Sequence, residues 1–116
     1  MMQMWNLNKM WQVEYLRDAV DDIKQLDHAQ RVQVIKAINK VAVNPLAQAE
    51  GGYGKPLGNK GITNLAGFCK IKLLKLGIRV VYKLVREDNV MKIIVVSARA
   101  DDEVYRLAEK RKKNDS

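Results

Sequence analysis

Hydrophobic and polar residues alternate in some stretches of the chain and recur at helical spacing in others. The segment WQVEYL at 11–16 alternates apolar and polar side chains and is rich in β-branched and aromatic residues, which predicts a strand. Between residues 17 and 43 the apolar positions recur every three to four residues in two sets, which predicts a pair of helices. Asp27 lies between the sets and can cap the second helix. Asn44-Pro45 ends the pair, because the residue before proline disfavours helical backbone.

The glycine-rich segment from Pro45 to Gly67 shows no persistent period. Six of the seven glycines lie between residues 51 and 67. Connections of this length are uncommon in small domains and are often flexible or functional. We therefore expect one long mobile connection, whose Lys55 and Lys60 are candidates for contacts with a phosphate backbone. Its sequence contains neither GxGxxG nor GxxxxGK[ST], so a nucleotide-binding glycine loop is not supported.

Alternation returns in the last third of the chain and predicts strands over about 68–75, 78–86 and 90–97. The final segment, DDEVYRLAEKRKK, begins with acidic and ends with basic residues, as the helix dipole favours. The expected architecture is a two-layer α+β fold of order β-α-α-β-β-β-α, with an antiparallel meander sheet and the helices on one face. The length of 116 residues and the hydrophobic content of 47% fit a single domain over 11–116, with an N-terminal extension over 1–10.

The net positive charge arises in the second half of the chain. Residues 1–50 carry six Lys/Arg and six Asp/Glu, whereas residues 51–116 carry fifteen and seven, and the net charge of +8 arises there. Such an asymmetry indicates an anionic partner, either nucleic acid or an acidic protein. A solubilising surface is the simpler alternative.

Other features of the composition indicate a cytoplasmic protein without a membrane partner. The apolar runs are far shorter than the roughly 20 residues of a membrane-spanning helix. The first residues do not have the pattern of a secretory signal. The single cysteine, Cys69, cannot form a disulfide within the chain, and as an inward-facing strand residue it is expected in the core.

The stretch FCKIKLLKLGIRVVYKL at 68–84 predicts a β-hairpin with cations on one face. Alternation places its apolar residues inward and Lys70, Lys72 and Arg79 outward. A two-residue loop at 75–76 sets Lys72 opposite Arg79, and like charges in that position destabilise a sheet by up to about 1 kcal/mol. A polyanion would relieve this repulsion, which favours a phosphate-binding face over a set of scattered surface lysines.

The residues available for catalysis are few. His28 is the single histidine and lies in the half without net charge, so a mechanism that uses two histidines is impossible within this chain. The sequence has no His/Cys cluster with metal-ligand spacing, and we expect neither a metal nor a cofactor. Lysine, arginine and tyrosine remain, which can position a phosphodiester and stabilise its developing charge.

Three stretches carry a resemblance to a known family: CKIKL at 69–73, GIRVVYKL at 77–84 and VVSARADDEVYRLAEKR at 95–111. With them, from about residue 11, the chain resembles the RelE group of the RelE/ParE toxin superfamily of bacterial toxin-antitoxin modules. The resemblance implies a RelE-like fold and a metal-independent endoribonuclease, an mRNA interferase that cuts translated mRNA on the ribosome. It also implies contacts with ribosomal RNA and a cognate antitoxin, in a toxin–antitoxin hetero-oligomer.

The same resemblance implies roles for particular residues. Lys70 would help to deprotonate a ribose 2′-hydroxyl for in-line attack on the adjacent phosphate, and Arg99 would assist the leaving 5′-oxygen. Lys72 and Arg79 would stabilise the phosphorane, and Tyr105 would stack on or orient a base. Five further basic residues are expected to contact RNA: Lys55, Lys60, Lys83, Arg106 and Lys110.

Several alternatives stay open. Strict alternation in the last strand puts Arg99 on the inward face, so a bulge or the end of the strand near Ser97 must redirect it. Tyr105 also fits the core stripe of the last helix, and the acidic run 101–103 either softens the local positive field or caps that helix. A ParE-like toxin that inhibits gyrase is disfavoured by the paired lysines. An inactive homologue that binds nucleic acid or an antitoxin is the most modest alternative.

Overall fold

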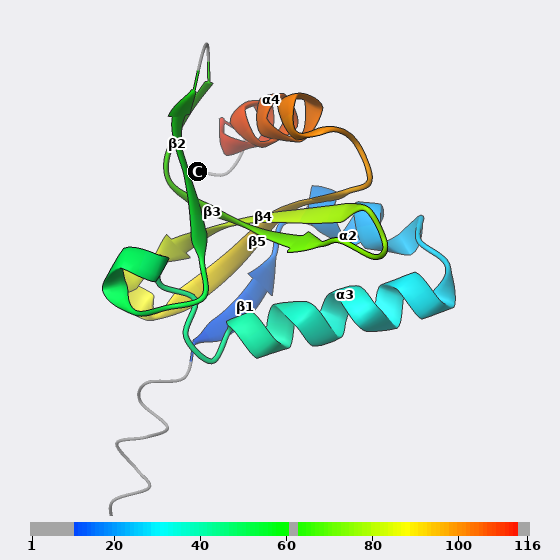
Figure 1. Ribbon diagram of the computed structural model, residues 1–116, viewed down its shortest axis with the longest axis horizontal. Coiled ribbons are helices and arrows are strands. Elements are labelled where there is room, and N and C mark those ends of the chain that lie inside the picture. Colours follow the sequence, from blue (N-terminus) through cyan, green and yellow to red (C-terminus); the bar gives the residue numbers. More distant parts are fainter. Residues whose placement is uncertain (1–10, 61–62, 114–116) are drawn as a thin grey trace, which may run out of the picture.

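The computed structural model describes residues 11–60 and 63–113, which form a mixed five-stranded sheet and three α-helices (Figure 1). The strands are β1 (Gln12–Tyr15), β2 (Lys55–Lys60), β3 (Thr63–Leu73), β4 (Ile78–Val85) and β5 (Val90–Ser97). The helices are α2 (Arg17–Lys24), α3 (His28–Val41) and α4 (Asp101–Lys112), with short 3₁₀ turns η1 (Gln48–Glu50) and η2 (Arg86–Asp88). The predicted α+β class is confirmed. Within the described ranges, no helix is both long and apolar enough to cross a membrane. The predicted extension over 1–10 lies outside the described residues.

The order of strands across the sheet is β1-β5-β4-β3-β2. Strands β3, β4 and β5 form the predicted antiparallel meander, and the hairpin has the predicted register, with Lys72 opposite Arg79. Strand β1 pairs with β5 in parallel, which makes the sheet mixed. The predicted cap of α3 is also confirmed: the Asp27 carboxylate accepts from the backbone N–H of Gln30 at 2.8 Å.

The sequence predicted that the glycine-rich segment is one long mobile connection, and this prediction is wrong. The segment contains η1, a bridge between Ala47 and Gly54, and the edge strand β2. Its glycines permit close backbone packing: a Cβ on Gly52 would lie 2.1 Å from the carbonyl oxygen of Leu46. Strand β2 has no alternating pattern because Pro56 and glycine interrupt it, and it is held by hydrogen bonds to β3 and by burial of Leu57 in the core under α4.

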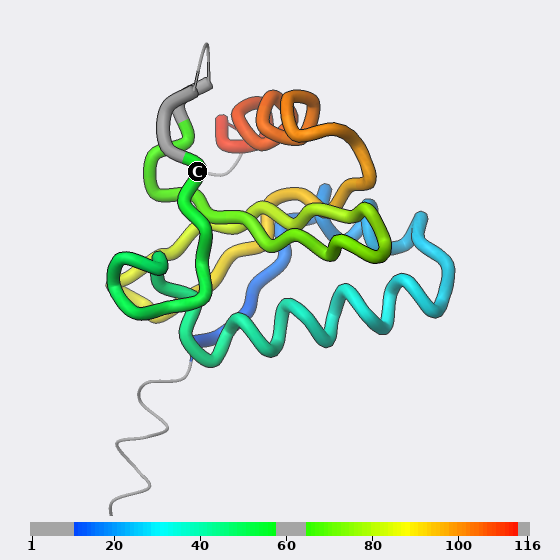
Figure 2. Tube along the Cα trace, viewed as in Figure 1, coloured from blue at the N-terminus to red at the C-terminus, as the bar shows by residue number. Residues whose placement is uncertain are grey.

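Helices cover both faces of the sheet, whereas all of them were expected on one face. Helices α2 and α3 pack on one face, and α4 packs on the other. Figures 1 and 2 show the β3–β4 hairpin between α3 and α4. The physical reason lies in the central strands, which are apolar on both sides: neighbours Val80 and Val81 face opposite helices and are both fully buried.

Strand β5 contains a β-bulge. Val95 pairs with Val81 and Ile93 pairs with Tyr82, so that Ile94 is an additional residue. Ile94 and Val95 consequently both face α4. The bulge reverses the alternation of everything that follows it, and Ser97 therefore lies opposite Arg79 on the α4 face.

Beyond residue 93 the edge of β5 is closed by side chains, because β1 has ended there. The Val96 N–H donates to the Asp22 carboxylate at 2.9 Å, and the Ile94 carbonyl accepts from the Arg111 guanidinium at 2.9 Å. Arg111 and Asp22 also pair directly, at 2.7 and 3.0 Å. These two side chains satisfy strand groups that a neighbouring strand would otherwise bond.

Candidate functional site

A group of charged side chains gathers where α4 begins to cross the sheet. We call it the cationic cluster and define it as Lys70, Lys72 and Arg79. The pairing register aligns Lys72 with Arg79 and Ser97 across three strands, and directly opposite residues of neighbouring strands share a face. All three cations therefore lie on the α4 face of the sheet, as the hairpin pattern predicted.

Lys70 contacts Tyr105 of α4. Its Nζ donates to the Tyr105 hydroxyl at 2.7 Å and lies 5.5 Å from the centre of the ring. The Tyr105 side chain is 9% exposed and packs in the core cluster under α4 with Phe68 and Val81. The tyrosine ring is thus a core residue, as one of the two alternatives predicted, and its hydroxyl is a hydrogen-bond partner of Lys70.

Lys72 and Arg79 share a partner that sequence reasoning did not place in the site. The Asp101 carboxylate pairs with Lys72 Nζ at 3.6 Å and with Arg79 Nε. Burial by itself raises the pKa of Asp101, but the hydrogen bond and charge of Arg79, with the charges of Lys70 and Lys72, outweigh it and lower that pKa below its usual range. Asp101 is therefore ionised at neutral pH. From the sequence, the acidic run 101–103 was expected either to soften the local positive field or to cap the helix, without Asp101 being singled out as a partner of Lys72 and Arg79.

Arg99 reaches the cluster through its backbone. Its carbonyl oxygen accepts from Arg79 Nη1 at 2.8 Å, and its N–H donates to Ser97 Oγ at 3.1 Å. The Arg99 side chain is exposed. The bulge in β5 is the redirection that the sequence required, because it brings Ser97 and the loop after it to the α4 face.

Of the other predicted RNA-contacting residues, one lies beside the cationic cluster and the rest lie elsewhere on the sheet and on α4. Lys55 is exposed on the edge strand and lies opposite Lys70 in the pairing register, so it extends the cluster by one strand. Lys60 pairs through its backbone with Thr63 farther along the same strands. Lys83 lies opposite Phe68 and Lys92, whereas Arg106 and Lys110 are exposed on α4.

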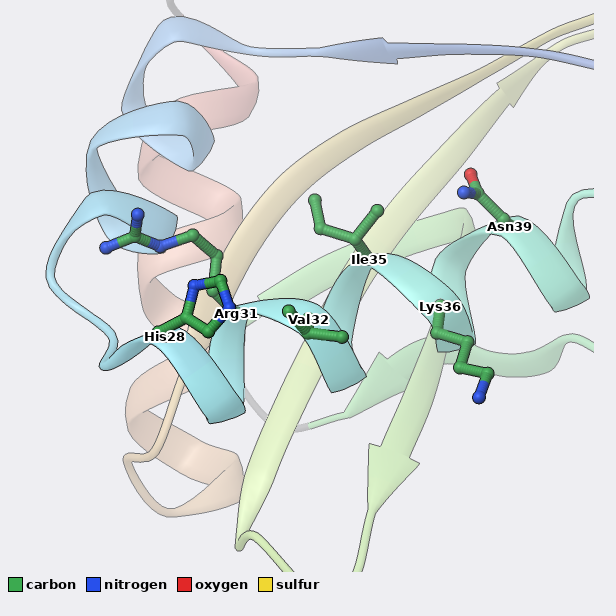
Figure 3. A pocket seen from close by; sticks show the side chains of 6 residues that line it. All are labelled: His28, Arg31, Val32, Ile35, Lys36 and Asn39. Atoms are coloured by element: carbon green, nitrogen blue, oxygen red, sulfur yellow. The ribbon is translucent and has the colours of Figure 1, made fainter.

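His28 lies on the opposite face of the molecule. It is exposed at the start of α3 and lines a shallow pocket on the outer surface of that helix (Figure 3). The pocket is lined by His28, Arg31, Val32, Ile35, Lys36 and Asn39. Because α3 and α4 cover different faces of the sheet, the histidine is separated from the cationic cluster by the sheet itself.

Comparison with known proteins gives a consistent set of relatives. No family model matches the chain. A RelE-like toxin protein of Escherichia coli is 28% identical over 101 residues, which cover 87% of this chain and 96% of that protein. Among solved structures, a double mutant of the Escherichia coli toxin RelE in the free state is 26% identical with a TM-score of 0.68, covering 88% of this chain and 97% of the other. In a RelBE toxin–antitoxin complex from Mycobacterium tuberculosis, the matching chain is 26% identical with a TM-score of 0.61, and the match covers 79% of this chain and 94% of that one. Each likeness spans more than three quarters of both chains.

Proposed function

Since this chain is a RelE-type toxin of the RelE/ParE toxin-antitoxin superfamily, we propose that it is a metal-independent endoribonuclease that cleaves mRNA on the ribosome and thereby inhibits translation. The observation that carries the proposal is the meeting of Lys70, Lys72 and Arg79 beside Tyr105 on one surface. Cations at a developing phosphorane stabilise it electrostatically, and this kind of catalysis needs no histidine.

In the proposed reaction the ribose 2′-oxygen attacks the adjacent phosphorus, and the bond from phosphorus to the 5′-oxygen breaks. Lys70 helps to deprotonate the 2′-hydroxyl. Lys72 and Arg79 bind the non-bridging oxygens and stabilise the charge that develops on them. Arg99, whose side chain is exposed beside the cluster, assists the departing 5′-oxygen.

We assign to Tyr105 the role of positioning Lys70. Its ring is almost fully covered by neighbouring core residues, so a base has little of the ring to stack on. Its hydroxyl contacts the Lys70 ammonium at 2.7 Å and limits the directions that this side chain can take. The resemblance implied that Tyr105 stacks on or orients a base; we propose instead that it holds Lys70 in position.

The ribosome and an antitoxin complete the proposal. A site with so few groups gains from a substrate that another body holds in the reactive geometry, and the decoding site of the ribosome supplies this. Exposed Lys55, Arg106 and Lys110 would contact ribosomal RNA. One relative forms a toxin–antitoxin complex, and we extend this to the present chain: a cognate antitoxin covers the basic surface, in a hetero-oligomer in the cytoplasm.

Primer extension on a translated message tests the proposal. The wild type should produce discrete cuts, and the double variant Lys70→Ala/Arg99→Ala should lose them. Lys36→Ala is the matched control, because it removes one charge from the exposed surface of α3 on the other face of the sheet. Equal cleavage by the wild type and the double variant would show that the cluster is not the active site. Inhibition of gyrase with intact messages would favour the ParE-like alternative, and growth without either effect would favour an inactive homologue.

A further inference from the structure

The carboxylate of Asp101 takes the position in which the proposed reaction needs a phosphate. Lys72 and Arg79 are the two cations assigned to the non-bridging oxygens, and in the free protein both pair with this one side chain. A carboxylate and a phosphodiester each present two anionic oxygens to such donors. The free protein thus holds an anion of its own between the two cations.

Helix capping does not explain this placement. The residue at the cap of α4 is Ala100, and the helix start has no side-chain cap hydrogen bond. Asp102 and Glu103, in the same first turn, already supply negative charge to the helix dipole. Asp101 differs from them in being directed at the cations.

We propose that Asp101 is an internal competitor for the anionic substrate, a carboxylate that an RNA phosphate has to displace from Lys72 and Arg79. The identity of that substrate rests on the proposed function, whereas the competition itself does not. A phosphodiester carries one negative charge, as the carboxylate does, so the exchange adds little electrostatic attraction at this point. Binding of free RNA is weakened for this reason.

Displacement is physically accessible. The side chains of Lys72, Arg79 and Asp101 are 31%, 25% and 34% exposed, so water reaches all three and partly screens their charges, although Arg79 Nε and Asp101 Oδ1 themselves are buried against each other. The lowered pKa of Asp101, to which the Arg79 hydrogen bond and the neighbouring charges contribute against its burial, keeps the competitor charged at neutral pH. A substrate held in place by the ribosome has a high effective concentration and overcomes the competition. Free RNA lacks this advantage, so Asp101 strengthens the dependence on the ribosome.

Removing the charge of Asp101 while keeping its shape tests the inference. Asp101→Asn should bind a single-stranded 2′-O-methyl RNA, which cannot be cleaved by 2′-hydroxyl attack, about three- to tenfold more tightly than the wild type in low salt. The control is Asp102→Asn, which removes the same charge from the next residue of the helix. Asp102 is exposed, and among the residues that the structure describes it makes no ion pair with the cluster. Fluorescence anisotropy measures both affinities.

Two further variants keep the test decisive. Asp101→Glu retains the charge and should bind as weakly as the wild type. Asp101→Ser removes the charge with a residue suited to a helix start, and it replaces the asparagine variant should that variant not fold. Affinity of the neutral variants no higher than that of Asp102→Asn, or equal gains for the glutamate and asparagine variants, would overturn the inference.

Cleavage is read separately from binding. In a ribosomal assay, the neutral variants should lower KM and leave kcat near the wild-type value, because the displacement occurs on binding. If no variant cleaves while Asp101→Asn still binds RNA more tightly than its control, the proposed nuclease activity fails and the competition stands. If the wild type cleaves mRNA and the neutral variants show no gain in RNA affinity, the proposed nuclease activity stands and the competition by Asp101 fails.

Discussion

The ammonium of Lys70 donates a hydrogen bond of 2.7 Å to the hydroxyl of Tyr105, and this bond joins the central strands to α4 at the candidate site. The partners come from residues 35 positions apart, so the contact depends on how α4 crosses the sheet. A hydroxyl on a buried ring is a rigid support for a flexible lysine, since the ring itself is fixed by its packing.

Removing that hydroxyl alone should lower kcat of the proposed reaction clearly while changing the stability of the protein only slightly. Tyr105→Phe keeps the buried ring, so we expect the free energy of unfolding to change by no more than about 1.5 kcal/mol. Lys70 loses its support, and kcat should fall by about tenfold with KM nearly unchanged. The control is Tyr53→Phe, which removes a hydroxyl from an exposed tyrosine. Unchanged kcat in Tyr105→Phe would contradict the positioning role.

The pair of Arg111 and Asp22 should matter for stability. Their side chains are 12% and 16% exposed, so removing the guanidinium leaves a carboxylate largely buried beside β5. Arg111→Met should lower the free energy of unfolding by about 2 to 4 kcal/mol, measured by urea denaturation. Arg106→Met on the exposed side of the same helix should change it by less than about 0.5 kcal/mol. Similar losses from the two variants would show that Arg111 acts only through helix propensity.

Glycine at position 52 should be required by its surroundings. A methyl group there would lie 2.1 Å from the Leu46 carbonyl oxygen, which belongs to the backbone and cannot turn aside. Gly52→Ala should therefore destabilise the protein by more than about 2 kcal/mol. At Gly51 the space is open but φ is +87°, so Gly51→Ala should lose only about 1 to 2 kcal/mol. Thermal unfolding of the two variants compares these effects, and an equal loss would contradict the steric explanation.

Tyr82 should make stability sensitive to alkaline pH. Burial raises the pKa of its phenol above the usual value, with a smaller contribution from Cys69, and its hydroxyl donates to the Pro45 carbonyl at 2.8 Å. A raised pKa in the folded state means that the contribution is complete below the unfolded pKa near 10 and declines above it. The difference in unfolding free energy between the wild type and Tyr82→Phe should fall by up to about 1.4 kcal/mol per pH unit above about pH 10. A constant difference from pH 8 to pH 11.5 would contradict this.

The hairpin at the candidate site was predictable because its determinants are local. Alternation fixed which residues face outward, and the short turn fixed the register that sets Lys72 opposite Arg79. The cap at Asp27 was predictable for the same reason, since its partner Gln30 is three residues away.

Other parts of the fold depend on contacts that the local pattern does not contain. Strand β2 forms because its backbone pairs with the edge of β3, and its own residues show no alternation that would predict a strand. The face chosen by α4 follows from central strands that are apolar on both sides. The pairing of Asp101 with the cationic cluster requires that face and the bulge together, which is why the sequence could not place this residue in the site.

The bulge at Ile94 shifts the alternation of the strand by one residue. Ile93 faces α2 and α3, Ile94 and Val95 both face α4, and Val96 faces α2 and α3 again. If the same eight residues paired with β4 without the bulge, Val96 would lie opposite Arg79, and Ser97 with the approach to Arg99 would lie on the side of α2 and α3. The one additional residue in β5 therefore determines on which face of the sheet the segment from Ser97 to Asp101 begins, and so whether Asp101 can meet Lys72 and Arg79.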